Sequence, residues 1–189
     1  MAGIKEQLRL AALHSYHVLD TKPEPLFDDM VRDLARMARV PISLISLVDA
    51  ERQWFKARHG LDVAETDRRI SFCTVAVDQA DDFLIVPDAR RDPRFADSPL
   101  VTGAPNIRFY AGRVLRTPLG QNMGTINIID TRPRNELSES IKEMMTAYSL
   151  QVIATFDRHR ADRIFSDARR TTQGNSPVNA YIGGLRARS

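Results

Sequence analysis

Residues 108–130, RFYAGRVLRTPLGQNMGTINIID, decide the fold, because they read as two antiparallel strands joined by a tight turn. From Phe109 to Leu115 the side chains alternate with the period of two that a strand requires. Pro118 and Gly120 interrupt this alternation, and their backbone preferences favour a turn. The segment MGTINIID then resumes as a second strand, so we take this hairpin as the centre of the protein.

The second strand of the hairpin is expected to present two different faces. Ile126 and Ile128 share one face, and Thr125, Asn127 and Ile129 share the other. A strand with one apolar and one mixed face suits a sheet that packs a core on one side. The mixed side is then expected to line a small pocket.

Five stretches in one collinear order resemble the GAF domain, a small regulatory ligand-binding domain of bacterial and eukaryotic signalling proteins. The resemblance covers the chain from about Leu13 to Arg160. It implies an α+β fold, with a central antiparallel sheet of five or six strands, terminal helices packed on one face and a loop-covered pocket on the other. The five stretches are RFYAG followed by G-T-x-x-x-I-D in the hairpin, LDTKPEPLFDDMVRDLARM at 19–37, VPISLISLVDAERQWFKARHGL at 40–61, RRISFC at 68–73, and VPDARRDPRFADSPLVTG at 86–103.

Two positions depart from the pattern of the bacterial subgroup. Val114 stands where a proline is expected, and Asn127 stands where the subgroup often carries a cysteine. Relatives that reduce free methionine sulfoxide use more than one cysteine to form and resolve a disulfide. Cys73 is the only cysteine of this chain and therefore has no intramolecular partner for that cycle. Bilin-binding relatives attach their chromophore through a cysteine next to a histidine, whereas Cys73 precedes Thr74. We therefore expect a non-enzymatic module without an identified cofactor, and a thiol reductase is the less favoured alternative.

The resemblance places the ligand between the mixed face of the sheet and the loops. Arg94 and Arg108 would pair with an anionic ligand such as a nucleotide, a carboxylate or a small oxyanion, or would form internal ion pairs instead. Cys73 is either a reactive thiol or a small buried hydrophobic residue, and Trp54 either stacks on the ligand or belongs to the core. Asp88, Asp92 and Arg94 line the pocket mouth or tie their own loop together. The candidate ligand-binding residues are Trp54, Phe72, Cys73, Arg94, Phe95, Arg108, Tyr110 and Asn127.

Helices and strands are expected on both sides of the central hairpin. Apolar residues at helical spacing predict a helix over 26–37, and apolar or alternating runs predict strands at 42–48, 53–58 and 83–86. After the hairpin, a stripe that begins at Leu137 and weakens toward Phe165 predicts a helix longer than a small sheet needs. We therefore expect the 137–165 helix to pair with a second copy as a homodimer. The predicted division is an N-terminal helix at 1–20, the GAF domain at 21–160 and a basic, flexible tail at 161–189.

The chain has 189 residues and a net charge of +3, and this charge comes from its C-terminal end. Residues 158–189 contain seven arginines and two aspartates, a net charge of +5, so the remainder carries −2. Nucleic-acid binding by the folded domain is therefore not expected. A single cysteine, no run of ~18 apolar residues and no secretory signal pattern predict a cytoplasmic protein without membrane contact.

The chain contains no phosphate-binding loop, dinucleotide fingerprint, zinc-protease motif or kinase signature. His14 and His17 are three residues apart, a spacing that metal ligands use, but no third ligand is obvious. The resemblance implies a sensory or regulatory module that binds a small molecule and signals to a downstream protein, such as a histidine kinase or a cyclic-nucleotide enzyme. The alternative is a ligand-free dimerisation or protein-docking module.

Overall fold

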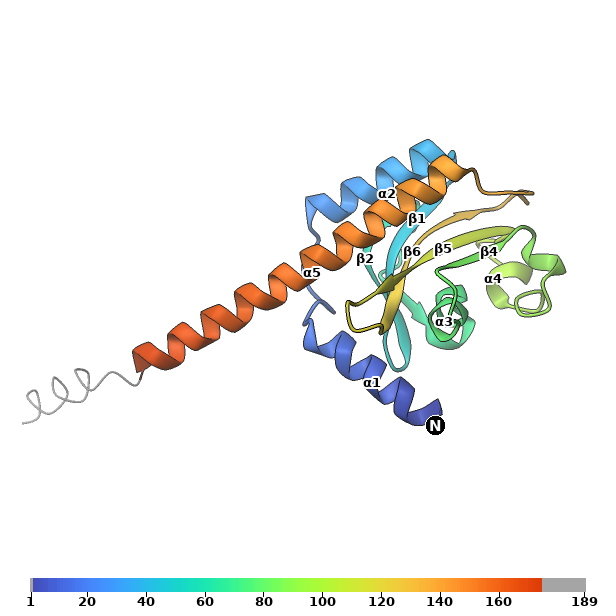
Figure 1. Ribbon diagram of the computed structural model, residues 1–189. Helices are drawn as coiled ribbons and strands as arrows, with labels where there is room; N and C mark the ends of the chain where they lie inside the picture. Colours follow the sequence, from blue (N-terminus) through green and yellow to red (C-terminus); the bar gives the residue numbers. More distant parts are fainter. Residues whose placement is uncertain (1, 175–189) are drawn as a thin grey trace, which may run out of the picture.

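A six-stranded antiparallel sheet forms the centre of the protein, with the strand order β3-β2-β1-β6-β5-β4 (Figure 1). The computed structural model describes residues 2–174. The sheet confirms the predicted α+β architecture, including the strands expected at 42–48 and 83–86. The strands are β1 (Ile42–Val48), β2 (Arg52–His59), β3 (Glu65–Asp67), β4 (Phe83–Val86), β5 (Phe109–Arg116) and β6 (Asn122–Asp130).

The β5–β6 hairpin lies inside the sheet, because β6 also pairs with β1. Gly112 lies opposite Asn127 in this hairpin, and Val114 lies opposite Thr125. Gly124 is required where β6 approaches β1, since a Cβ atom there would lie 1.9 Å from the carbonyl oxygen of Ser46. This close pairing brings polar residues of three strands to one face.

Helices cover the two faces of the sheet unequally (Figure 1). The long helices α2 and α5 pack on one face, as predicted for terminal helices, and α3 packs on the other face together with the 87–107 segment. Ser71 begins α3 by accepting a hydrogen bond from the backbone N–H of Thr74. The helices are α1 (Ala2–Ser15), α2 (Pro25–Ala38), α3 (Phe72–Asp78), α4 (Pro99–Thr102) and α5 (Glu139–Gly174), with single 3₁₀ turns at Arg68–Ile70 and Ala89–Arg91.

The face beneath α2 and α5 holds a predominantly apolar core, which also contains the buried and unpaired Ser43 hydroxyl of β1. The rings of Phe27 and Phe156 meet edge to face, with centroids 5.4 Å apart, and neither side chain is exposed. Ile126 and Ile128 point into this core from β6, as the alternation of the hairpin predicts. This packing anchors the first half of α5 on the sheet.

The N-terminal helix α1 is fixed to one end of the sheet by a buried arginine. Arg9 is 5% exposed and donates hydrogen bonds to the carbonyl oxygen of Val48 at 2.7 Å and to Glu6. Arg68 also pairs with Glu6, at 2.7 Å. The two arginines, Arg9 first, lower the pKa of Glu6 from its usual 4.5 to about 2. The carboxylate therefore stays ionised and holds α1 to the body of the protein.

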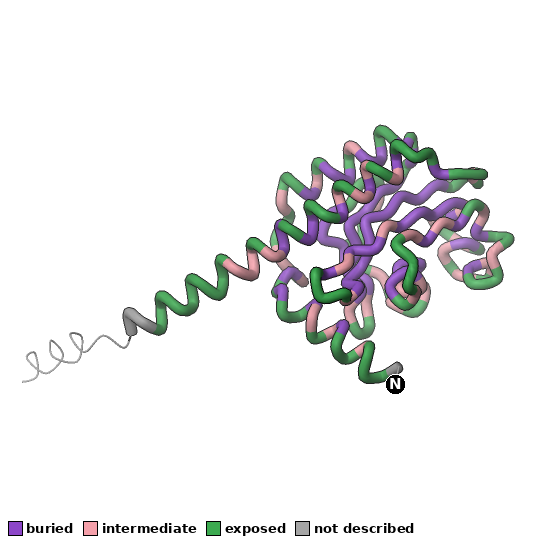
Figure 2. The backbone as a smooth tube through the Cα atoms, viewed as in Figure 1, coloured by how far each residue is buried: buried purple, intermediate pink, exposed green. Residues whose placement is uncertain are grey.

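Helix α5 continues well beyond the body of the domain (Figure 2). At the point where it leaves, the Tyr16 hydroxyl donates to Asp157 at 2.8 Å, and the Arg160 guanidinium lies 4.3 Å from the Tyr16 ring centroid. The helix reaches Gly174 and so extends into the 161–189 region that the sequence assigned to a flexible tail. No glycine or proline interrupts the sequence between Glu139 and Gly174, so nothing local ends the helix earlier. The remainder of the predicted tail, 175–189, lies outside the described residues.

Two features were not predicted. The three-residue strand β3 is polar and too short to show a period, and the 87–107 segment contains a 3₁₀ turn and the short helix α4. None of the helices within residues 2–174 is long and apolar enough to span a membrane.

Candidate functional site

An aromatic wall lies on the sheet face opposite α2 and α5. The rings of Phe72 on α3 and Phe95 in the 87–107 segment stack with centroids 4.0 Å apart and an interplanar angle of 10°. The Tyr110 ring on β5 lies 5.1 Å from that of Phe72. Each of these three side chains is at most 4% exposed, so the wall closes the sheet face from solvent.

A cluster of polar groups lies behind this wall, which we call the polar cluster. It consists of Ser46, Cys73, Tyr110, Thr125 and Asn127, and none of them is more than 2% exposed. Thr125 Oγ1 lies 3.1 Å from Cys73 Sγ and 3.3 Å from the Tyr110 hydroxyl. The amide nitrogen of Asn127 donates to Ser46 Oγ and to Thr125 Oγ1, each at 3.0 Å. Groups from β1, α3, β5 and β6 thus form one hydrogen-bonded network.

Asn127 is the incompletely satisfied member of the polar cluster. Its amide nitrogen has two hydroxyl acceptors, but its Oδ1 atom is buried and has no hydrogen-bond partner in the structure. Buried polar atoms almost always have a partner, and an unpaired acceptor costs about 1–3 kcal/mol. The amide therefore presents an open acceptor inside the domain.

Local sequence explains how the cluster forms. Thr125 and Asn127 are two residues apart on β6, so both point to the face away from α5. Gly112 leaves room for the Tyr110 phenol, because a Cβ atom at that position would lie 2.2 Å from the Tyr110 hydroxyl oxygen. Ser43 and Ser46 both interrupt the apolar strand ISLISLV, and only Ser46 reaches the polar cluster, so the sequence showed polar positions in β1 without showing which one joins the site.

The thiol and the phenol of the polar cluster are held in their neutral forms. Burial raises the pKa of Cys73 above its ordinary value, against the opposing hydrogen bond from Thr125. Burial and the neighbouring Cys73 also raise the pKa of Tyr110. A nucleophilic cysteine requires the thiolate form. The cluster is therefore suited to hydrogen bonding and poorly suited to thiol chemistry.

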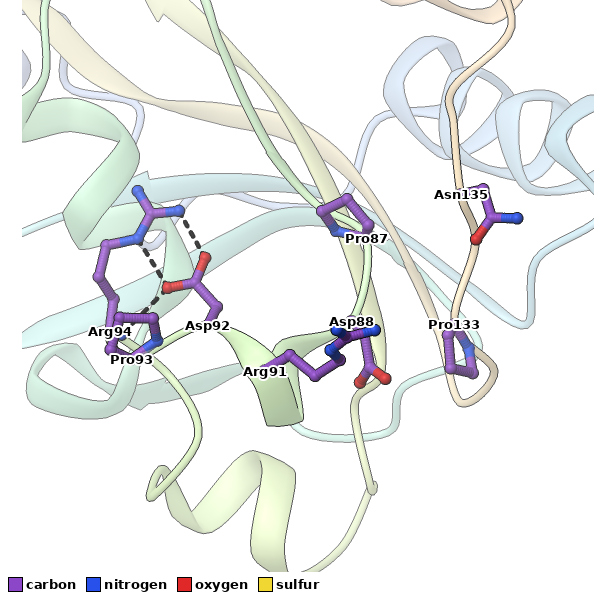
Figure 3. A pocket seen from close by; sticks show the side chains of 8 residues that line it. All are labelled: Pro87, Asp88, Arg91, Asp92, Pro93, Arg94, Pro133 and Asn135. Carbon is purple, nitrogen blue, oxygen red and sulfur yellow. Dashed lines mark hydrogen bonds and ion pairs between the residues drawn. The ribbon is translucent and has the colours of Figure 1, made fainter.

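The two candidate arginines are engaged within the 87–107 segment. Arg94 forms a two-pronged ion pair with Asp92, with Nη2–Oδ2 at 2.6 Å and Nε–Oδ1 at 2.9 Å (Figure 3). Arg108 donates to the carbonyl oxygens of Val101 and Ile107, at 2.8 and 3.0 Å. The Asp92–Arg94 arrangement recurs at Asp88–Arg90 and Asp67–Arg69. The pairs Asp88–Arg90 and Asp92–Arg94 agree with the predicted alternative in which side chains of the 87–107 segment form ion pairs with one another.

A surface cavity of about 600 Å³ lies beside this segment (Figure 3). It contains Arg94 and none of the residues of the polar cluster. Its lining consists of Pro87, Asp88, Arg91, Asp92, Pro93, Arg94, Pro133 and Asn135. Of the predicted site residues, Arg94 lines this cavity, whereas Cys73, Tyr110 and Asn127 belong to the buried polar cluster.

Trp54 lies apart from the other candidates, as the alternative that assigns it to the core expects, and its role in ligand binding stays a prediction. Its side chain is 8% exposed and packs in the core beneath α2, on the sheet face opposite Cys73. Ala57, three residues later, contributes to the same core, which strict alternation would not allow. The ladder between β1 and β2 shifts at Ile45 and Ser46, so Lys56 is an extra residue that breaks the alternation. Phe72, Cys73, Phe95, Tyr110 and Asn127 remain together.

The histidines form no metal centre in the part of the chain that the structure describes. His14 Nε2 instead lies 2.8 Å from Asp49 Oδ1 and links α1 to the turn between β1 and β2. This contact is a structural ion pair or hydrogen bond.

Comparison with known proteins identifies close similarity in sequence and in fold. The model of the GAF domain family matches residues 22–156. A cyclic di-GMP phosphodiesterase of Pseudomonas aeruginosa is 39% identical over 149 residues, which covers 79% of this chain and 25% of that protein. The chain thus spans about a quarter of the length of this curated relative.

Solved structures resemble the fold at low sequence identity. The GAF domain of an Acinetobacter phosphoenolpyruvate-protein phosphotransferase has a TM-score of 0.59 and 15% identity, covering 82% of this chain and 96% of that one. A type II free methionine-R-sulfoxide reductase from Thermoplasma acidophilum has a TM-score of 0.57 and 14% identity, covering 71% of this chain and 92% of that one. At these identities, the likeness establishes the fold alone.

Proposed function

Because this chain belongs to the GAF domain family, we propose that it is a non-enzymatic regulatory module of a signalling system. In this proposal the polar cluster binds a small ligand, and the terminal helix α5 passes the signal to a partner protein. The observation that carries the proposal is the unpaired Oδ1 of Asn127 inside the domain.

The open acceptor defines the ligand chemistry. An N–H or O–H group of a ligand would satisfy Asn127 Oδ1 and remove the cost of leaving it unpaired. Arg94 is already bound by Asp92, and Arg108 is bound by backbone carbonyl groups. We therefore favour a neutral ligand with a hydrogen-bond donor over the anionic ligand that the sequence predicted.

Access to the polar cluster requires movement of the aromatic wall. Phe72 belongs to α3, and Phe95 belongs to the 87–107 segment, so a ligand must displace one or both of these elements. Such a ligand shifts the equilibrium only by its difference in affinity for the open and closed arrangements. The wall therefore acts as the element whose position reports ligand binding.

The same strand connects the polar cluster to α5. Asn127 lies on β6 between Ile126 and Ile128, which pack into the core beneath α5. A displacement of β6 on the ligand side thus changes the packing under α5. Pairing of α5 with a second copy would carry this change to a downstream protein, such as a cyclic-nucleotide enzyme or a histidine kinase. The relative named a cyclic di-GMP phosphodiesterase supports a signalling partner of the first kind.

A binding experiment with a matched control tests the proposal. Native mass spectrometry would be recorded for the purified chain alone and with a defined mixture of nucleosides, amino acids and sugars. We expect a reproducible adduct that Asn127→Leu abolishes, because this change removes the open acceptor. Ser43→Ala is the control, since Ser43 Oγ is also buried without a partner but lies outside the polar cluster.

Two results would contradict the ligand proposal. One is a chain that stays bare throughout the mixture, which would favour the ligand-free docking module. The other is an adduct that persists in Asn127→Leu, which would place the ligand elsewhere. A methionine sulfoxide reductase activity that Cys73→Ser eliminates would overturn the non-enzymatic assignment.

A further inference from the structure

Residues 90–107 form the larger part of the connection between β4 and β5, contain α4, and make a self-contained unit that we call the lid (Figure 1). Every hydrogen bond and ion pair that the lid forms within the described part of the chain ends on a residue between 88 and 108. The ion pair between Asp92 and Arg94, at 2.6 Å, is one of these internal contacts. The lid can therefore move as one body and keep its own polar contacts.

The lid contacts the rest of the domain through apolar side chains. Phe95, Val101 and Ile107 are each at most 4% exposed and belong to the core on the α3 side of the sheet. Phe95 stacks on Phe72 and so completes the aromatic wall. Apolar contacts are non-directional, so the main cost of separating the lid from the domain is the exposure of these side chains to water.

The two ends of the lid meet in a short neck. The Ala89 N–H group donates to the carbonyl oxygen of Arg108 at 2.6 Å, and the Arg108 N–H group donates to the carbonyl oxygen of Asp130 on β6 at 2.9 Å. The Arg134 N–H group donates to the carbonyl oxygen of Pro87 at 3.0 Å. The neck is thus fixed to β6 and to the segment that leads into α5, which makes it the point about which the lid can turn.

The other moving candidate of the aromatic wall, α3, is tied to the sheet at both ends. Ser71, which begins the helix, donates its hydroxyl hydrogen to Gln53 Oε1 on β2. At the other end, the amide nitrogen of Asn122 on β6 donates to the carbonyl oxygens of Val77 at 2.9 Å and Gln79 at 3.3 Å. A displacement of α3 would break these bonds, and a buried polar group that loses its partner is costly.

We propose that the lid, and not α3, opens to admit the ligand to the polar cluster. In the closed arrangement Phe95 lies on Phe72. In the open arrangement the lid turns about the neck and withdraws Phe95, while Phe72 stays with α3. This inference rests on the ligand site of the proposed function and names the element that regulates access to it.

Labelling of Cys73, the single cysteine of the chain, measures this opening without any ligand. Its side chain is 2% exposed behind the aromatic wall, so a thiol reagent reacts only after the wall opens or the domain unfolds. Each rate would be divided by the rate of the same chain unfolded in urea, at one pH, and followed at urea concentrations below the unfolding transition. Lid opening exposes little surface, so the rate should depend weakly on urea, whereas global unfolding depends on it steeply.

Two lid variants should accelerate the labelling. Phe95→Ala removes the ring that holds the lid to α3, so we expect the rate to rise at least about tenfold. Val101→Ala shortens a lid contact outside the aromatic wall, so we expect a rise of about three- to tenfold. Because Val101→Ala leaves the wall intact, its effect reports movement of the lid and excludes a hole beside the thiol.

Two controls separate the lid from other routes to Cys73. Gln53→Met removes the bond that fixes the start of α3 and should leave the rate within about twofold of the parent value. Phe27→Ala is a matched truncation in the core beneath α2. It lowers global stability, but it should leave the labelling rate at low urea unchanged.

Three results would overturn the lid. If Gln53→Met accelerates labelling at least as much as Phe95→Ala, α3 is the moving element. If Val101→Ala has no effect, the lid does not move. If Phe27→Ala accelerates labelling as much as Phe95→Ala, Cys73 reacts only after global unfolding.

The lid and the ligand site are tested independently. The labelling experiment contains no ligand, so a negative result removes the lid and leaves the polar cluster as a site that is entered in another way. The adduct experiment with Asn127→Leu decides the ligand site. An adduct that Asn127→Leu does not abolish removes the site and leaves the opening of the lid as measured.

Discussion

The two faces of the sheet are both buried, but they are built from different chemical groups. Beneath α2 and α5 the contacts join apolar side chains, among them Phe27, Leu34 and Phe156, each with 0% exposure. Beneath α3 an aromatic wall surrounds hydroxyl, thiol and amide groups, and Asn127 Oδ1 has no partner. The first face contributes stability. The second contains a buried acceptor whose missing partner lowers stability.

The largest effect is expected on the apolar face. Phe156→Ala should lower the free energy of unfolding by about 3–5 kcal/mol, because the ring is fully buried against Phe27 and its removal leaves a cavity. Equilibrium unfolding in urea measures this loss. A loss below about 1 kcal/mol would show that α5 is not anchored by this core, and the contrast between the faces would fail.

A polar group stabilises the fold only when its hydrogen-bonding atoms are paired, and Glu6 is the paired counterpart of Asn127. Glu6 is fully paired, and its pKa falls from 4.5 to about 2 because Arg9, and then Arg68, bind the carboxylate. A folded-state pKa below the unfolded value stabilises the protein above about pH 4.5, and this contribution is lost as the pH falls toward 2.

Glu6→Gln tests this pairing. The variant should lose about 1–2 kcal/mol at pH 7, a value reduced for the partial exposure of the carboxylate, and it should lose less than the parent on acidification. Unfolding curves at pH 7, 4 and 3 measure the difference. Parallel pH profiles for the two proteins would show that Glu6 contributes nothing to the attachment of α1.

The alternation of residues along β6 could be predicted because it is a local property. Ile126 and Ile128 face the apolar core, and Thr125 and Asn127 face the polar cluster, as the period of two requires. The pairing of Asp92 with Arg94 is also local, since the two residues are only two positions apart. From the sequence, Arg94 could bind either Asp92 or an anionic ligand, because both would attract its guanidinium group.

The position of Trp54 could not be predicted, because it depends on the register between two strands. Lys56 is the extra residue in the β1–β2 ladder, and its buried ammonium group binds Glu24 Oε1 at 2.7 Å, next to the start of α2. In the sequence before Gly174, the absence of glycine and proline favours a continued helix, whereas the highly charged composition favours a flexible tail. The extension of α5 could be predicted only by giving the first feature more weight. The position of Trp54 thus depends on a long-range interaction, whereas the length of α5 depends on a balance of local preferences.

Tyr110→Phe should have a smaller effect than either change above. The variant keeps the ring in the aromatic wall and removes only a hydroxyl that lies 3.3 Å from both Cys73 Sγ and Thr125 Oγ1. The distance to Thr125 is long for an O–H···O hydrogen bond, and a thiol is a weak hydrogen-bond partner, so we expect a loss of about 0.5–1 kcal/mol in unfolding free energy. A loss above about 2 kcal/mol would mean that the polar cluster is a structural network, which would argue against the proposed ligand-binding role.

The smallest effect is expected for Asn127→Leu, the variant that most directly separates the two faces. It removes two hydrogen bonds, to Ser46 and Thr125, but it also removes the unpaired Oδ1. The Thr125 hydroxyl keeps its contacts with Cys73 and Tyr110, and loss of the unpaired Oδ1 offsets part of the lost hydrogen bonding, so the unfolding free energy should stay within about 1 kcal/mol of the parent value. Urea denaturation measures it beside Ile128→Ala, a truncation on the apolar face of the same strand that should cost about 2–5 kcal/mol. If Asn127→Leu costs as much as Ile128→Ala, then Asn127 is retained for stability and the two faces do not differ in role.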